Sequence, residues 1–207
     1  AIAIWSLPNK NTFTATQGEL RRCASFSQQN LQNCFVVKPY QSNATFYSIG
    51  TKNAHVLNES KTWLKEHLNL PKASNSVLNL PDYTRKVGQA VNALKQEGDF
   101  EKVVFSRCKD VAIDGFNFLW LDALRAAYPN AFISLVQDQN LGTWITASPE
   151  LFLYRKADFF KSFSLAGTKH GKDSDLGKKE EKEQQIVTDF ISNAFEQNGL
   201  IAEVKKG

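Results

Sequence analysis

The stretch W-I-T-A-S-P-E-L-F-L-Y-R-K-A-D-F-F-K-S-F-S-L-A-G-T, residues 144–168, decides how the rest of the chain is interpreted. An apolar strand is expected over Thr143–Ala147, and a sharp bend follows at Ser148-Pro149 because proline donates no hydrogen bond to a β-ladder. A second apolar strand is expected over Glu150–Tyr154, and the stretch ends in the turn Gly167-Thr168. We therefore expect two strands and two turns that together build a site.

Glu150 stands at the head of an apolar run. A carboxylate in apolar surroundings is costly unless it is paired or protonated. Position alone leaves two roles open for this side chain. The more common one is a glutamate at a strand edge held by a nearby Lys or Arg, and the other is a functional acid.

The segment L-A-G-T-K-H-G-K, residues 165–172, is similar to a phosphate-binding loop only at first sight. G-x-x-x-G-K followed by Asp173 does not match the spacing G-x-x-x-x-G-K-[ST], so we exclude a nucleotide site of that kind. A glycine turn with free backbone N–H groups, a hydroxyl and cations remains, which suits a small carboxylate. A plain hairpin turn is the alternative that the residues leave open.

Composition and charge narrow the class of protein. The 207 residues are 42% hydrophobic and 22% charged, which is typical of one large folded domain or two small ones. The net charge of +4 is diffuse and predicts no nucleic-acid partner. No apolar run has membrane-spanning length and no signal segment opens the chain, so we expect a cytoplasmic protein without a membrane partner. Three cysteines without C-x-x-C spacing fit a reducing cytosol: Cys23, Cys34 and Cys108.

Apolar periodicity and turn residues predict alternating strands and helices along the chain. Strands are expected at Ala1–Trp5, Cys34–Val37, Ala44–Ile49, Lys102–Cys108 and Phe132–Val136. Helices are expected at Glu59–Leu68, from Asp82 to a stop at Gly98, and at Phe118–Tyr128. Residues 71–81 are the best candidate for a surface crossing. Neither histidine of this part has a second ligand at a usable spacing, so both are interpreted as surface or packing residues: His55 and His67.

A last helix is predicted after the charged run K-K-E-E-K-E, residues 178–183. Its apolar positions recur at helical spacing: Ile186, Val187, Phe190, Ile191 and Phe195. Glu183 lies three residues before Ile186 and seven before Phe190, so among the acids of the run it is the one expected to face inward.

Four blocks of this sequence jointly resemble the chorismate-utilising enzymes, and among their branches the isochorismate synthases. The blocks are K-V-V-F-S-R, A-S-P-E-L-F-L-Y-R, L-A-G-T and E-x-x-I-V-x-D-F-I, and they occur in the family's order between Lys102 and Ile191. The resemblance implies an α+β, anthranilate-synthase-like fold of packed antiparallel β-sheets with helices outside. It also implies that residues 1–207 form the amino-terminal portion of a single chorismate-binding domain.

The resemblance implies a role for each residue that matches a family motif. Lys102 corresponds to the base that activates water for attack on C2 of chorismate, and Glu150 to the general acid that protonates the departing C4 hydroxyl. Glu183 corresponds to a ligand of Mg²⁺, a hard cation that prefers carboxylate oxygens. Substrate contacts are implied for Ser148, Gly167 and Thr168.

Two positions distinguish the branches of the family. Ammonia-using members typically carry glutamine where this chain has Lys102, and aminodeoxychorismate synthase typically carries lysine where this chain has Ala166. Both positions favour water as the nucleophile. Salicylate synthase, which keeps the lysine and the acid, remains an alternative, and the implied product fits menaquinone and siderophore biosynthesis alike.

A catalytically silent domain that binds chorismate or a partner is the alternative from another class. It is suggested by Thr146 and Gln184, where the family usually has glycine and histidine. It is also suggested by the expected absence of the carboxyl half, which supplies a second Mg²⁺ glutamate and substrate-gripping Tyr and Arg residues in the family. We expect residues 1–207 alone to be inactive, and the resemblance leaves the oligomeric state open.

Overall fold

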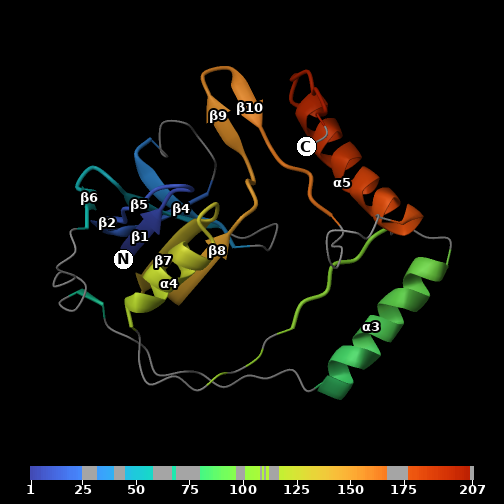
Figure 1. The fold of residues 1–207 in the computed structure, drawn as a ribbon, viewed down its shortest axis with the longest axis horizontal. Coiled ribbons are helices and arrows are strands. Elements are labelled where there is room, and N and C mark those ends of the chain that lie inside the picture. The colour runs from blue at the N-terminus through green and yellow to red at the C-terminus, as the bar shows by residue number, and fades with distance from the viewer. Residues whose placement is uncertain are drawn as a thin grey trace. The chain divides into compact units, whose positions relative to one another are not determined.

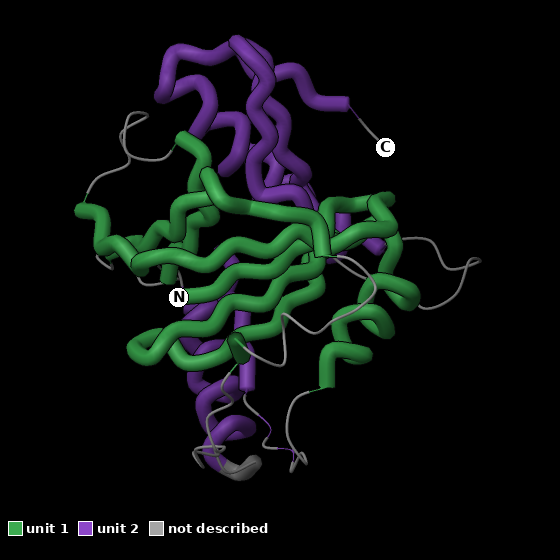
Figure 2. Tube along the Cα trace, turned by 90° about the vertical axis from the view of Figure 1, so that its left-hand side faces the viewer, with its two compact units in different colours: residues 1–73, 112–149 green, residues 74–111, 150–207 purple. Residues whose placement is uncertain are grey.

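The structure is a computed structural model. It describes residues 1–24, 32–39, 45–57, 67–68, 80–96, 101–107, 109, 111, 117–166 and 177–205. The chain divides into two units, coloured separately in Figure 2. Unit 1 comprises residues 1–73 and 112–149, and unit 2 comprises residues 74–111 and 150–207.

Two antiparallel sheets form unit 1. The larger has five strands in the order β6-β2-β1-β7-β8. Its strands are β1 (Ile2–Ser6), β2 (Thr14–Gln17), β6 (His55–Val56), β7 (Phe132–Asp138) and β8 (Gly142–Ser148). The smaller has three strands in the order β3-β5-β4. They are β3 (Leu20–Cys23), β4 (Cys34–Val37) and β5 (Phe46–Gly50).

Each face of the larger sheet has its own apolar core, because successive strand residues point to opposite sides. On one face, Ile4 of β1 and Leu135 of β7 pack with Leu121 of helix α4 (Leu119–Ala127), and all three are 0% exposed. Figure 1 shows α4 lying against β7. The helix therefore covers this face of the sheet.

The other face packs against the smaller sheet. Ala3 of β1, Val136 of β7 and Ile49 of β5 form one buried cluster. Aromatic rings extend this cluster: the centroid of Phe35 in β4 lies 5.4 Å from that of Trp5. Unit 1 is thus two sheets packed face to face with a helix outside, which is the α+β arrangement expected from the sequence.

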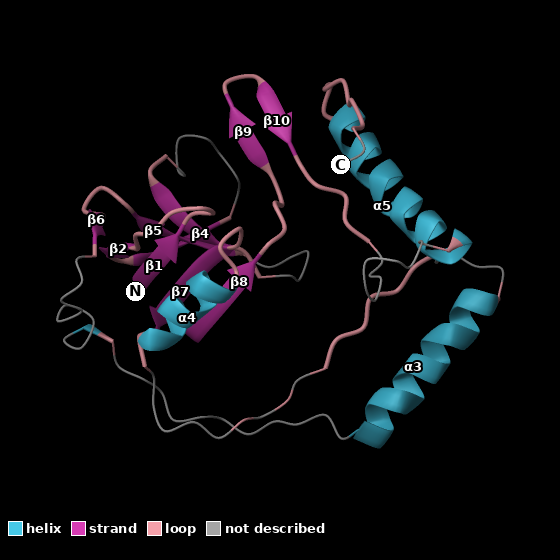
Figure 3. Ribbon diagram, in the orientation of Figure 1, coloured by secondary structure: helices cyan, strands magenta, loops and turns pink. Residues whose placement is uncertain are grey.

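The described residues of unit 2 form two long helices and a hairpin. Helix α3 spans Leu80–Lys95 and helix α5 spans Lys178–Gln197. Strands β9 (Tyr154–Lys156) and β10 (Phe159–Lys161) pair antiparallel around a two-residue turn. Ala157 in that turn has φ of 51°, the left-handed conformation that tight hairpin turns favour. Figure 3 shows the loop after β10 running towards the amino-terminal half of α5.

Several predicted elements are confirmed with shifted ends. The expected strands at residues 1–5, 34–37, 44–49, 132–136 and 143–147 correspond to β1, β4, β5, β7 and β8, and the helix over residues 118–128 corresponds to α4. The helix expected from Asp82 begins at Leu80. Proline is tolerated in a first helical turn, where its missing N–H has no helical partner, so Pro81 does not exclude this earlier start. The helix predicted at residues 59–68 and the helix stop at Gly98 lie largely outside the described residues.

Two predicted strands are wrong. Residues 102–107 have no strand structure, and Phe105 packs on a helix instead. A strand needs a neighbour to pair its backbone groups, and the described residues provide none for this segment. The strand predicted over Glu150–Tyr154 begins only at Tyr154, and Phe152 within it is 92% exposed.

Within the part of the chain that the structure describes, no helix combines the length and the apolarity that crossing a bilayer requires.

Candidate active site

Lys102 opens a segment without regular secondary structure that packs on helix α3. The Phe105 ring meets Tyr83 of α3 edge to face, with ring centroids 6.2 Å apart. The Arg107 guanidinium lies over the same tyrosine, 6.0 Å from the ring centroid. These contacts hold residues 102–107 against the helix without a β-ladder. The contacts of Phe105 and Arg107 with Tyr83 therefore fix the position of Lys102, which lies three and five residues before them.

Lys102 and Glu183 form an ion pair within unit 2. Lys102 Nζ lies 3.0 Å from Glu183 Oε1, and the two side chains are 24% and 34% exposed. Glu183 is in the second turn of α5, whose charged start carries Glu180 and Glu181 in the first turn. Partial burial reduces solvent screening of the pair relative to a fully exposed one. The structure thus brings an amine and a carboxylate together from segments that are distant in sequence.

Gln184, the next residue of α5, holds the segment that follows the β9–β10 hairpin. Its Nε2 donates to the Ser164 carbonyl at 2.6 Å and to Ser164 Oγ at 2.7 Å. Its Oε1 accepts from the Ala166 backbone N–H at 2.9 Å. Thr188, one turn further along α5, joins the group through a 2.7 Å contact between Thr188 Oγ1 and Ser164 Oγ.

The same segment is joined to the residues that follow Glu150. Ser162 Oγ donates to the Phe152 carbonyl at 2.8 Å, and the Phe163 N–H donates to the Leu151 carbonyl at 3.4 Å. Residues 162–166 therefore connect the surroundings of Glu150 to α5. Glu150 itself is exposed, as are Phe152 and Leu153 of the apolar run expected to shield it.

The predicted site residues are distributed over both units. Lys102 and Glu183 meet, and Glu150 belongs to the same unit. Ser148 is exposed at the end of β8 in unit 1, opposite Phe132 of β7. The predicted substrate turn Gly167-Thr168 lies outside the described residues.

Sequence reasoning missed the group formed by Ser164, Gln184 and Thr188. Gln184 and Thr188 are four residues apart, so they share one helix face, and this spacing of polar residues was the available signal. In the sequence, Gln184 stood out only because the family usually has histidine at this position. The other departure, Thr146, forms a cross-strand hydroxyl pair in unit 1, with 2.7 Å between its Oγ1 and Ser134 Oγ.

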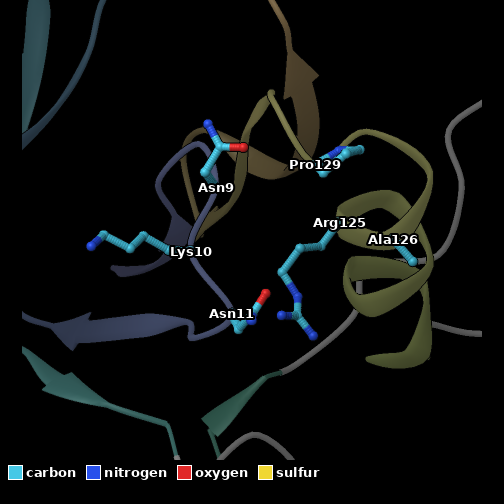
Figure 4. A pocket seen from close by; sticks show the side chains of 6 residues that line it. All are labelled: Asn9, Lys10, Asn11, Arg125, Ala126 and Pro129. Carbon is cyan, nitrogen blue, oxygen red and sulfur yellow. The ribbon is translucent and has the colours of Figure 1, made fainter.

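Unit 1 has a hollow of about 410 Å³ between the β1–β2 loop and the end of α4 (Figure 4). Its lining is Asn9, Lys10, Asn11, Arg125, Ala126 and Pro129. In Figure 4 the Lys10 side chain extends away from Arg125. Arg125 is engaged by Asp122 at 3.4 Å and lies over the Phe13 ring. The described lining contains no carboxylate, so this hollow gathers no acid–base pair.

Residues 6–205 match the family described as chorismate binding enzyme. The chain therefore belongs to that family, whose members are enzymes that act on chorismate. No curated protein and no solved structure matches the chain. The antiparallel sheets and helices of the described residues agree with an α+β member of the family.

The Mg²⁺ ion implied by the resemblance requires oxygen ligands. Among the described residues, no group of three His, Cys, Asp or Glu side chains is close enough to hold a metal. Mg²⁺ keeps several waters and is commonly bound by one or two carboxylates together with substrate oxygens. The partly exposed Glu183 carboxylate has the chemistry of one such ligand.

Proposed function

We propose that the intact protein is a Mg²⁺-dependent isochorismate synthase. The observation that carries this proposal is the 3.0 Å contact between Lys102 and Glu183 in a chain of the chorismate binding enzyme family. In the branch that this sequence resembles, these positions provide the base that activates water and a ligand of the metal. The base and the metal ligand must lie next to each other for a chemical reason.

Substrate geometry supplies that reason. The nucleophile attacks C2 of chorismate, and the adjacent ring carbon, C1, bears the carboxylate that would meet the metal. A base serving C2 and a metal ligand serving the C1 carboxylate must therefore lie side by side. The leaving hydroxyl is on C4, across the ring from C1, so its acid belongs on a different segment. The contact between Lys102 and Glu183 supports the first requirement, and Glu150 lies on a different segment of the same unit, in line with the second.

The reaction balances with one water consumed and one released. For this step Lys102 has to be in its neutral amine form, and its Nζ then takes a proton from the attacking water as the C2–O bond forms. The ring double bonds shift, and the C4–O bond breaks as Glu150 donates its proton to the departing hydroxyl. When bound, Mg²⁺ would neutralise the ring carboxylate, with Glu183 as one of its ligands. No oxidant, reductant or further cofactor is needed.

Salicylate synthase is the second candidate, because it shares the lysine and the acid. It eliminates pyruvate from isochorismate, whereas isochorismate synthase stops at the isomer. The silent-domain alternative remains an outcome of the assay below, and Thr146 and Gln184, which suggest it, both make hydrogen bonds in the structure.

Incubating the intact protein with chorismate and Mg²⁺ tests the proposal. The products are separated by chromatography and identified by mass. We expect a new peak with the mass of chorismate, because isochorismate is its isomer, and no salicylate or pyruvate. Salicylate as the main product would support the second candidate, and unchanged chorismate would favour the silent domain.

A further inference from the structure

The side-chain amide of Gln184 takes the place of a neighbouring β-strand for residues 164–166. In an extended segment, the carbonyl of one residue and the N–H of the residue two positions later point to the same side. Ser164 and Ala166 present such a pair, and the Gln184 amide donates to the first and accepts from the second. A primary amide carries both groups in one plane, as a peptide bond does.

Proton accounting fixes the orientation of this amide. The Ala166 N–H can only donate, so the atom facing it must be the amide oxygen. The two protons on Nε2 then go to the Ser164 carbonyl and to Ser164 Oγ. Thr188 Oγ1 donates to the Gln184 backbone carbonyl at 3.0 Å, which leaves Ser164 Oγ to donate to Thr188. Each proton has one acceptor, so the group is closed and rigid.

This closed group joins two parts of the proposed site. Gln184 directly follows Glu183, the residue that contacts Lys102. Ser162 and Phe163 of the segment that Gln184 holds are bonded to the carbonyls of Phe152 and Leu151, which follow Glu150 in the sequence. A change in the bonds of Gln184 therefore affects both the neighbourhood of the proposed metal ligand and the segment bonded to the residues after the proposed acid.

We propose that Gln184 is a positioning residue of the reaction, which fixes residues 164–166 against α5 and so sets the segment bonded to the residues after Glu150 relative to Glu183 and Lys102. This inference rests on the proposed function. Glutamine supplies two N–H donors and an acceptor, whereas glutamate lacks the donors and methionine offers no donor and only a weak sulfur acceptor.

The test compares Gln184→Met with Gln185→Met in the intact protein. Methionine approximates the shape of glutamine without its hydrogen bonds. Gln185 is the matched control, because it is exposed at the adjacent position of α5 and its side chain bonds Asp189, at 2.7 Å, instead of residues 164–166. Two quantities are measured: the hydrogen-exchange rate of the Ala166 amide, and kcat and KM for chorismate.

We expect the Ala166 amide to exchange at least about tenfold faster in Gln184→Met, because its acceptor is gone. We expect kcat to fall by about 100-fold, the cost of a small misplacement of reacting groups, with a much smaller change in KM. Gln185→Met should match the parent in both measurements. Unchanged exchange, or faster exchange with unchanged kcat, would overturn the inference.

A second variant covers a folding failure of the first. Gln184→Glu keeps the acceptor for Ala166 but removes both donors to Ser164, so kcat should again fall while part of the Ala166 protection remains; full activity in this variant would overturn the inference. If the parent protein converts chorismate into a different product, the proposed function is wrong, but the comparison of Gln184→Met with Gln185→Met still tests the positioning role. If the parent protein does not react with chorismate, both the proposed function and the positioning role of Gln184 are overturned.

Discussion

Lys102 and Glu183 form a contact that contributes little to folding and much to the proposed chemistry. An ion pair with side chains 24% and 34% exposed is worth about 0–1 kcal/mol, because water and salt screen it. A general base contributes roughly 100-fold or more to a rate. The contribution of Lys102 to stability is small and its contribution to the rate is large, so one substitution can distinguish them.

Lys102→Ala should reduce the rate of isochorismate formation by roughly 100-fold or more, because the attacking water loses its proton acceptor. The free energy of unfolding should fall by less than about 1 kcal/mol. Rates come from the chorismate assay and stability from urea denaturation. Lys86→Ala, on the exposed surface of α3, is the control and should retain both parent values. Equal rates for Lys102→Ala and the parent would remove Lys102 from its role as base.

At the scale of elements, α4 and the five-stranded sheet provide the core of unit 1. Leu121 is 0% exposed and packs against β1 and β7, whereas Leu119 on the same helix is 57% exposed. The pair offers the same substitution in two environments. Any difference in the free energy of unfolding between the two Leu→Ala variants should therefore come from burial of the side chain and not from helix propensity.

Leu121→Ala should lower the free energy of unfolding by about 2–5 kcal/mol, since it removes buried apolar atoms and leaves a cavity. Leu119→Ala should change it by no more than about 0.5 kcal/mol. Urea denaturation measures both. Similar losses for the two variants would show that α4 does not cover the sheet through Leu121.

Elements with local signals were predictable from sequence, and elements that depend on partners were not. Helix α4 and strand β7 follow from apolar periodicity within their own residues. Strands β2, β3 and β6 were missed, because T-A-T-Q, L-R-R-C and H-V are short and polar and exist only through pairing. For the same reason K-V-V-F-S-R, an apolar run without a described partner strand, was wrongly predicted as a strand.

The site was predictable only through the resemblance. No spacing rule links Lys102 to Glu183, because their contact depends on how α3, the 102–107 segment and α5 pack. The hydrogen bonds of Gln184 were equally hidden, since they join its side chain to the backbone of residues 164–166. The four-residue spacing of Gln184 and Thr188 marks one face of α5, but it does not show which backbone atoms that face contacts.

At the scale of the whole molecule, the two units differ in what holds them together. Unit 1 has apolar clusters with side chains at 0% exposure on both faces of its larger sheet. In unit 2, helix α5 has no buried residue, and its described contacts to residues 102 and 164–166 are polar. The proposed base, acid and metal ligand all belong to unit 2, and the family match extends over both units.

The central claim is that water, activated at Lys102, supplies the new hydroxyl oxygen. Turnover of chorismate in heavy-oxygen water, with the product analysed by mass early in the reaction, tests it directly. The account predicts isochorismate carrying one heavy oxygen atom, located at C2. Isochorismate without the label would show that the C4 hydroxyl migrates within the molecule, and would contradict the assignment of Lys102 as the base that activates water.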